Sequence, residues 1–167
     1  PFGPAVESVP LPESPLAFVV AQVRFPLVAS IADQDFIAQF QERIRSIYSD
    51  LKAENETQVT LTPDGVQVKE GSRVWRFSES DGPWEVALSS ESLALSTRSY
   101  TNREDFLTRL GVLLSALDER IAPRTVRRLG VRYIDRVTGP AASRESMKTL
   151  VRPEVLGATA VDLPDSV

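Results

Sequence analysis

The stretch that decides the fold is "TQVTLTPDGVQVKEGSRVWRFSESDGPWEVALSSESLALSTRS", residues 57–99. Short runs rich in β-branched and aromatic residues alternate there with the turn signals Pro63-Asp64-Gly65, Glu70-Gly71, Asp81-Gly82 and Ser89-Ser90-Glu91. The pattern predicts strands at residues 58–62, 66–77, 84–89 and 93–98, the second either continuous or broken at Gly71. Because turns this short join neighbouring antiparallel strands, we expect a meander of hairpins.

A strand and a helix are predicted before this meander. Residues 17–25 alternate apolar and polar positions as a half-buried strand does, and Pro26 ends the run. Residues 33–54 carry apolar side chains at helical spacing, with Asp33 or Ser30 as the N-cap. This segment predicts an amphipathic helix of about five or six turns.

A second helix and a last strand are predicted after the meander. Thr101 and Glu104 form a capping box ahead of an apolar stripe, and Pro123 ends the helix. In "RTVRRLGVRYIDRV", residues 124–137, Leu129, Val131 and Tyr133 alternate like the buried side of a strand. Arginines fall on the other side of the same strand.

The order of these elements predicts an α+β fold. Each helix has one apolar stripe, so we expect an antiparallel sheet of about five to seven strands with the two long helices packed on one face. Residues 17–138 form this domain. Residues 1–16, with five prolines, predict a proline-rich extended arm, either a docked strap or a free tail. Residues 139–167 form a C-terminal extension with a short helix near residues 143–150.

The composition excludes several kinds of function. The chain has no cysteine and no histidine, which removes thiolate catalysis, the commonest general base and most zinc sites. A formal charge of −4 argues against non-specific nucleic-acid binding. The sequence contains no long apolar run and no signal-peptide pattern, so we expect a cytoplasmic protein without membrane contact. We also expect no cofactor.

Four stretches, "PLAFVVAQVRF", "VWRFSESDGPWEVALSSESLALST", "YTNREDFLTRL" and "RLGVRYIDR", resemble a sporadically distributed, uncharacterised family of bacterial proteins. They lie within about residues 15–136, and the Arg-Leu-Gly-x-Arg-Tyr-Ile core of the last is the most specific. Asp135 stands where the family is expected to have asparagine, so no role of that amide is carried over. The resemblance implies no activity, substrate or cofactor. It implies that further β-rich sequence follows, so that residues 139–167 begin a second region.

The candidate site is a row of arginines on the sheet face away from the helices. By alternation, six arginines can share that face: Arg24, Arg76, Arg98, Arg128, Arg132 and Arg136. They predict a binding surface for a protein partner or a second copy of the chain, and alternatively for nucleic acid or a phosphate ligand. The competing interpretation is a solvated face, with arginines paired across strands to Glu79, Glu85 or Glu91. Missing C-terminal sequence is a further alternative cover for this face.

Two other clusters have structural and functional interpretations. Four aromatic residues, Trp75, Phe77, Trp84 and Tyr100, line either a ligand pocket or, as we expect, the core under the helices. Acidic residues at two places, Asp33 with Asp35 and Glu79 with Asp81, are candidates for a carboxylate metal-dependent hydrolase. Helix capping and turn formation account for the same acids, so we expect a non-catalytic module.

Overall fold

The computed structural model of the chain describes residues 14–62 and 65–156, and the side chains of these except residues 56–70 and residue 144. Most of the predicted arm, residues 1–13, and the end of the predicted extension, residues 157–167, lie outside the described residues. The chain divides into two compact units. One is Leu16–Ile134, and the other combines Pro1–Pro15 with Asp135–Val167.

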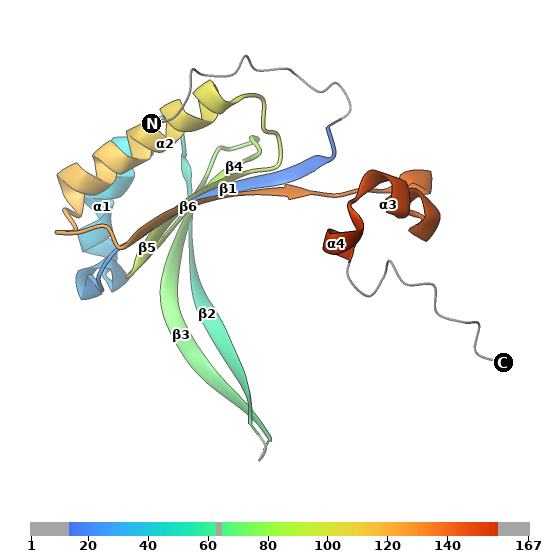
Figure 1. Ribbon diagram of the computed structural model, residues 1–167. Coiled ribbons are helices and arrows are strands. Elements are labelled where there is room, and N and C mark those ends of the chain that lie inside the picture. Colours follow the sequence, from blue (N-terminus) through green and yellow to red (C-terminus); the bar gives the residue numbers. More distant parts are fainter. Residues whose placement is uncertain (1–13, 63–64, 157–167) are drawn as a thin grey trace. The chain divides into compact units, whose positions relative to one another are not determined.

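The larger unit is built on a six-stranded antiparallel sheet, as predicted. Its strands lie in the order β2-β3-β4-β5-β1-β6, so that β2 and β6 form the two edges (Figure 1). The bounds are Leu16–Arg24 for β1, Asp50–Thr62 for β2, Gly65–Ser78 for β3, Trp84–Ser89 for β4, Ser92–Thr97 for β5 and Arg128–Asp135 for β6.

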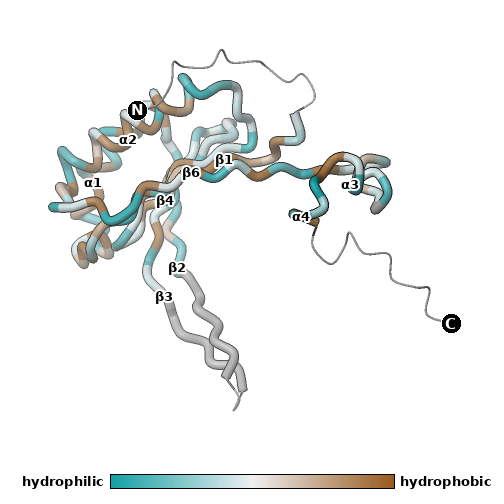
Figure 2. The backbone as a smooth tube through the Cα atoms, viewed as in Figure 1, coloured by the Kyte–Doolittle hydropathy of each residue, from teal (hydrophilic) through white to brown (hydrophobic). Residues whose placement is uncertain are grey.

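Two helices cover one face of this sheet, which confirms the predicted layer arrangement (Figure 1). They are α1, Gln34–Ile44, and α2, Arg103–Arg120, and a short 3-10 helix, η1, Ala29–Ala32, precedes α1. Figure 2 shows brown, apolar positions alternating with hydrophilic ones along both helices. The apolar positions of both helices pack on the sheet, and they contribute Ile37 and Phe40 from α1 and Leu110, Leu113 and Leu117 from α2 to the hydrophobic core.

The predicted aromatic cluster lies in this core. Trp75, Phe77 and Trp84 are at most 4% exposed, and Tyr100 packs against them from the margin. The Trp75 indole N–H donates a 2.6 Å hydrogen bond to the backbone oxygen of Ile31, which ties η1 to β3. The cluster is therefore a structural one, as we expected.

The first helix is shorter than predicted. It ends at Ile44, and residues from Asp50 onward belong to β2, where Asp50 pairs with Ser78 and Leu51 with Phe77. The apolar spacing continues through Tyr48, but that side chain is buried by packing and not within a helix. Strand pairing has overridden local helical spacing here.

Both long helices have side-chain caps at their N-termini. The Asp33 carboxylate accepts from the Asp35 backbone N–H at 2.8 Å, which confirms Asp33 as the cap of α1. The cap of α2 is Asn102, whose side chain accepts from the Asp105 backbone N–H at 2.8 Å. The predicted Thr101 cap was therefore wrong by one residue.

The hairpin of β2 and β3 extends beyond the rest of the sheet (Figure 1). The two strands pair from Asp50↔Ser78 to Thr62↔Gly65, with an irregularity between Asn55 and Thr57, whereas β4 pairs only with Val74–Ser78. Strand β3 is continuous through Gly71, so the alternative with a break there was wrong.

The described part of the smaller unit is helical. It contains a 3-10 helix, η2, Gly139–Ala142, followed by α3, Arg144–Leu150, and α4, Pro153–Leu156. Ser143 caps α3 by accepting from the Ser146 backbone N–H, and α3 matches the predicted short helix. Within this unit the Arg136 backbone N–H donates to the Pro15 oxygen at 2.7 Å.

Candidate interaction surface

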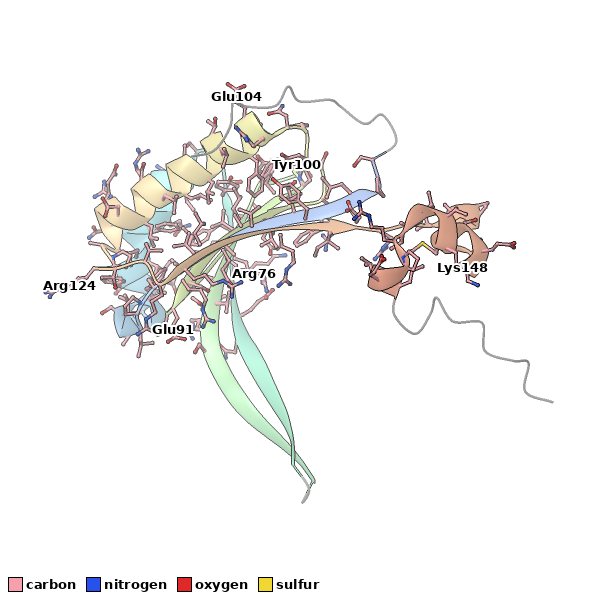
Figure 3. All side chains as sticks on the ribbon, viewed as in Figure 1. Arg76, Glu91, Tyr100, Glu104, Arg124 and Lys148 are labelled. Carbon is pink, nitrogen blue, oxygen red and sulfur yellow. The ribbon has the colours of Figure 1, made fainter. Side chains whose placement is uncertain are left out.

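The sheet face away from the helices has a floor of small side chains. Ala94 pairs with Gln22 on one side and with Ala87 on the other, and these positions alternate with buried residues of β1, β4 and β5. Serines continue the floor: Ser89, Ser92 and Ser96. Figure 3 shows Arg76 on this face and Tyr100 on the opposite face, toward α2. Neither α1 nor α2 covers this floor (Figure 1).

Two of the six predicted arginines are held by acidic partners. Arg76 bonds to Glu54 and, at 2.6 Å, to Glu85, and its pKa is raised chiefly by the hydrogen bond to Glu54. Arg24 lies 3.8 Å from Glu91. The pair of Arg76 with Glu85 is a cross-strand pair of the kind that the solvated-face interpretation predicted, and Arg24 pairs with Glu91 of the β4–β5 turn, which that interpretation also named.

The third predicted acidic partner, Glu79, lies elsewhere. Its carboxylate accepts from Arg109 of α2 at 2.6 Å, and the Arg109 guanidinium lies 4.4 Å from the centre of the Trp84 ring. Burial alone would lower the pKa of Arg109, but the hydrogen bond to Glu79 raises it. Glu79 therefore ties α2 to the turn after β3 and is not available to arginines of the open face.

Two further arginines of the predicted row are placed separately. The Arg98 guanidinium lies over the Phe18 ring at 5.9 Å, a cation–π contact within the larger unit. Arg136 belongs to the smaller unit. The structure therefore does not bring all six predicted residues into one site.

Arg128 and Arg132 remain together at one hollow. Its volume is about 300 Å³, and its lining is Val20, Gln22, Arg128, Gly130, Val131 and Arg132. Among the side chains that the structure describes, those of residues 14–55, 71–143 and 145–156, neither of these arginines forms an ion pair. A Cβ on Gly130 would lie 3.7 Å from Arg128 Nε, so the Arg128 side chain lies beside the glycine.

A second, polar hollow shares Gln22 with the first. It measures about 260 Å³ and is lined by Gln22, Arg24, Ser72, Ser89, Ser90, Glu91 and Ser92. Ser89 and Ser92 hydroxyls lie 2.9 Å apart. Sequence patterns do not reveal this hollow, because its serines come from three strands and the β4–β5 turn and only the sheet register brings them together.

Strand β6 is exposed on both of its faces. Leu129, Val131 and Tyr133 are 56%, 44% and 50% exposed, so the prediction that they form a buried side was wrong. On the other face Ile134 is 41% exposed. These residues are exposed because β6 lies at the edge of the sheet. The buried side chains of α1 and α2 pack against the inner strands instead.

The acidic candidates serve the fold. Asp33 caps α1 and Glu79 holds Arg109. Among the residues that the structure describes, no three His, Cys, Asp or Glu side chains gather in a way that could hold a metal ion. The predicted hydrolase acids therefore do not form one carboxylate cluster there.

Comparisons of the chain with protein-family models, with curated proteins and with solved structures found no match. No helix in the described part of the chain combines the length and apolarity needed to cross a bilayer. Function is therefore inferred from the chain's own surface.

Proposed function

We propose that this chain is a non-catalytic protein-interaction module whose binding surface is β6 with the arginine-lined hollow beside it. The observation that carries the proposal is the exposure of β6 on both faces, with four large apolar residues between 41% and 56% exposed. Single exposed apolar residues are ordinary, but a continuous run of them on one edge strand is typical of an interface.

The strand offers backbone groups as well as side chains. Among the described strands, β6 has β1 as its one neighbour, so its other side offers backbone N–H and C=O groups to a partner strand. Covering the exposed halves of Leu129, Val131 and Tyr133 would contribute about 1 kcal/mol for each side chain. Strand addition to β6 therefore supplies both hydrogen bonds and apolar burial.

The hollow supplies charge recognition. Arg128 and Arg132 have no acidic partner among the described residues, unlike Arg24 and Arg76. Two guanidinium groups without an acidic partner can form charge-assisted hydrogen bonds with carboxylates of a binding partner. Arginine is also enriched in protein interfaces. We therefore expect an extended protein segment with acidic side chains to fit this surface.

A peptide-binding experiment tests the proposal. The probes are a labelled 12-residue peptide of alternating Glu and Val and the same peptide with Lys for Glu, measured by fluorescence anisotropy. We expect the acidic peptide to bind the wild-type chain and to lose at least tenfold in affinity in Arg128→Glu/Arg132→Glu. The control, Arg43→Glu/Arg45→Glu at the C-terminal end of α1, changes the charge equally and should leave affinity unchanged. Equal binding by all three proteins, or neither peptide binding nor self-association of the wild type, would overturn the proposal.

The same two arginines favour a second candidate function, the binding of nucleic acid or a phosphate ligand. Its specific observation is that Arg128 and Arg132 line a hollow beside the polar Gln22. A single-stranded oligonucleotide in the same assay separates the two functions. Steeply salt-dependent oligonucleotide affinity that Arg128→Glu/Arg132→Glu abolishes would favour this candidate over the protein partner.

A further inference from the structure

We infer that the strand added to β6 is β6 of a second copy, paired antiparallel about a two-fold axis that passes through Val131 perpendicular to the sheet. The inference rests on the proposed function and names its partner. It comes from the order of side chains along Arg128–Asp135 and from the face on which each lies.

The two faces of β6 are fixed by contacts within the larger unit. Tyr133 meets Tyr100, which in turn meets Phe106 of α2, so odd-numbered residues lie on the helix side. Arg128, Gly130 and Arg132 line the hollow with Gln22, and Val131 also contributes to it. The Arg128 side chain lies on the side where Gly130 would carry its Cβ, so even-numbered residues lie on the open side. A two-fold axis perpendicular to the sheet keeps each face on its own side, so even residues oppose even and odd oppose odd.

This restriction leaves few registers, and charge discriminates among them. A register centred on Arg132 would oppose Arg132 with itself. A register centred on Gly130 would oppose Arg128 with Arg132. Like charges directly across a strand pair are destabilising, so both registers are disfavoured. Registers centred on Leu129 or Tyr133 contain no like-charge pair, but they align only residues 128–130 or 131–135 of the strand, whereas a register centred on Val131 aligns residues 128–134.

The register centred on Val131 is self-complementary. It opposes Arg127 with Asp135, Arg128 with Ile134, Leu129 with Tyr133, Gly130 with Arg132, and Val131 with itself. Opposite charges meet at both ends, and an aliphatic side chain meets an aromatic one on the helix side.

Gly130 has no side chain of its own to meet the arginine that this register places opposite it. Two nitrogen atoms at the far end of the Arg128 side chain lie 3.7 and 3.8 Å from a Cβ position on Gly130. The Arg132 side chain of the second copy therefore lies across the glycine only after this guanidinium turns aside. The result is one continuous sheet, with the half-exposed helix-side residues of both copies forming a single apolar strip.

Cysteine cross-linking tests both the pairing and its register, because the chain has no cysteine of its own. In Val131→Cys the two thiols face each other across the axis, within disulfide reach. In Leu129→Cys, the matched control from the same strand face, the two thiols lie four residues apart along the strands, about 13 Å. That separation is beyond the roughly 7 Å between Cα atoms that a disulfide allows.

We expect mild oxidation to convert most Val131→Cys protein to a covalent dimer while Leu129→Cys stays at least tenfold slower. A mixture of Leu129→Cys with Tyr133→Cys should give the mixed dimer. Thermal unfolding of the reduced variants checks that each is folded. If a cysteine variant does not fold, an exchange of charges, Arg127→Asp with Asp135→Arg, takes its place. Each of these two changes alone should weaken association in sedimentation, and the double variant should restore it. Absence of a Val131→Cys dimer, or equal cross-linking of Leu129→Cys, overturns the inference. If that occurs while the acidic peptide still distinguishes wild type from Arg128→Glu/Arg132→Glu, the proposed function stands and only the second copy is excluded.

Discussion

The ring of Tyr133 on β6 meets the ring of Tyr100 edge to face, with the ring centroids 5.7 Å apart. Tyr100 also packs against Phe106 of α2, at 5.9 Å, so this contact links the edge strand to the helical layer. Tyr133 nevertheless remains half exposed. One aromatic contact therefore positions β6 without covering it, which leaves the strand accessible for the interaction that we propose.

The Tyr pair predicts a change in alkaline titration. Burial, followed by the neighbouring Tyr133 hydroxyl, raises the pKa of Tyr100 to about 12. Tyr133→Phe keeps the ring contact and removes that hydroxyl, so the pKa of Tyr100 should fall. Titration of ¹³C-labelled tyrosine by NMR measures this directly, and an unchanged Tyr100 midpoint would contradict the assignment.

The same shift predicts how stability changes with pH. An acid whose folded-state pKa is raised keeps its proton longer in the folded state than in the unfolded one. Stability from Tyr100 is therefore present below about pH 10, the usual tyrosine pKa, and is lost as pH rises toward about 12. In Tyr133→Phe this alkaline loss should be smaller, as denaturant unfolding between these pH values would show.

The helix stripe predicts two different costs of truncation. Leu113 is fully buried, so Leu113→Ala should destabilise the chain by about 2 to 5 kcal/mol. Leu107 on the same helix is 48% exposed, and Leu107→Ala should cost less than about 1 kcal/mol. Urea unfolding of both variants checks the helix orientation. Similar losses for the two would contradict the packing of α2.

Two glycines should respond oppositely to alanine. A Cβ on Gly82 would lie 1.9 Å from Glu79 Oε2 and 2.6 Å from its Cβ, and Arg109 holds that carboxylate in place. Gly82→Ala should therefore cost about 1 to 3 kcal/mol. Gly111 in α2 has nothing within 4 Å, so Gly111→Ala should stabilise by about 0.5 to 1 kcal/mol. Thermal midpoints that move in the same direction would contradict this difference.

The sequence predicted the architecture well because its signals are local. The turns at Asp81-Gly82 and Ser90-Glu91 lie between β3, β4 and β5 as expected, and the stripe of α2 faces the core. The length of the first helix could not be predicted, because Leu51 has helical spacing but pairs with Phe77 through a register set by residues far along the chain.

The candidate site was predicted only in part, for a different reason. Alternation placed Arg76 and Arg132 on one face, but it carries no information on which arginine meets an acid across the sheet. It also cannot distinguish an inner strand from an edge strand, so Val131 resembled a core residue. Strand order, which local patterns do not encode, decided both outcomes.

Replacing an arginine that is ion-paired and replacing one that is not should change the free energy of unfolding by different amounts. Arg76→Met leaves Glu54 and Glu85 close together without their shared cation, so we expect a loss of up to about 1 kcal/mol, as for other exposed ion pairs. Arg132→Met removes no ion pair and should leave the unfolding free energy unchanged while altering binding. A larger loss in Arg132→Met would show that this arginine supports the fold.

Hydrogen–deuterium exchange of β6 as a function of protein concentration tests the central claim most directly. Pairing of a second strand with β6 protects the outward backbone N–H groups of Arg128–Asp135, whereas β4, Trp84–Ser89, is already paired on both sides. We predict that exchange in β6 slows markedly as concentration rises and that exchange in β4 does not change. Exchange in β6 that is fast and identical at every concentration would contradict the account.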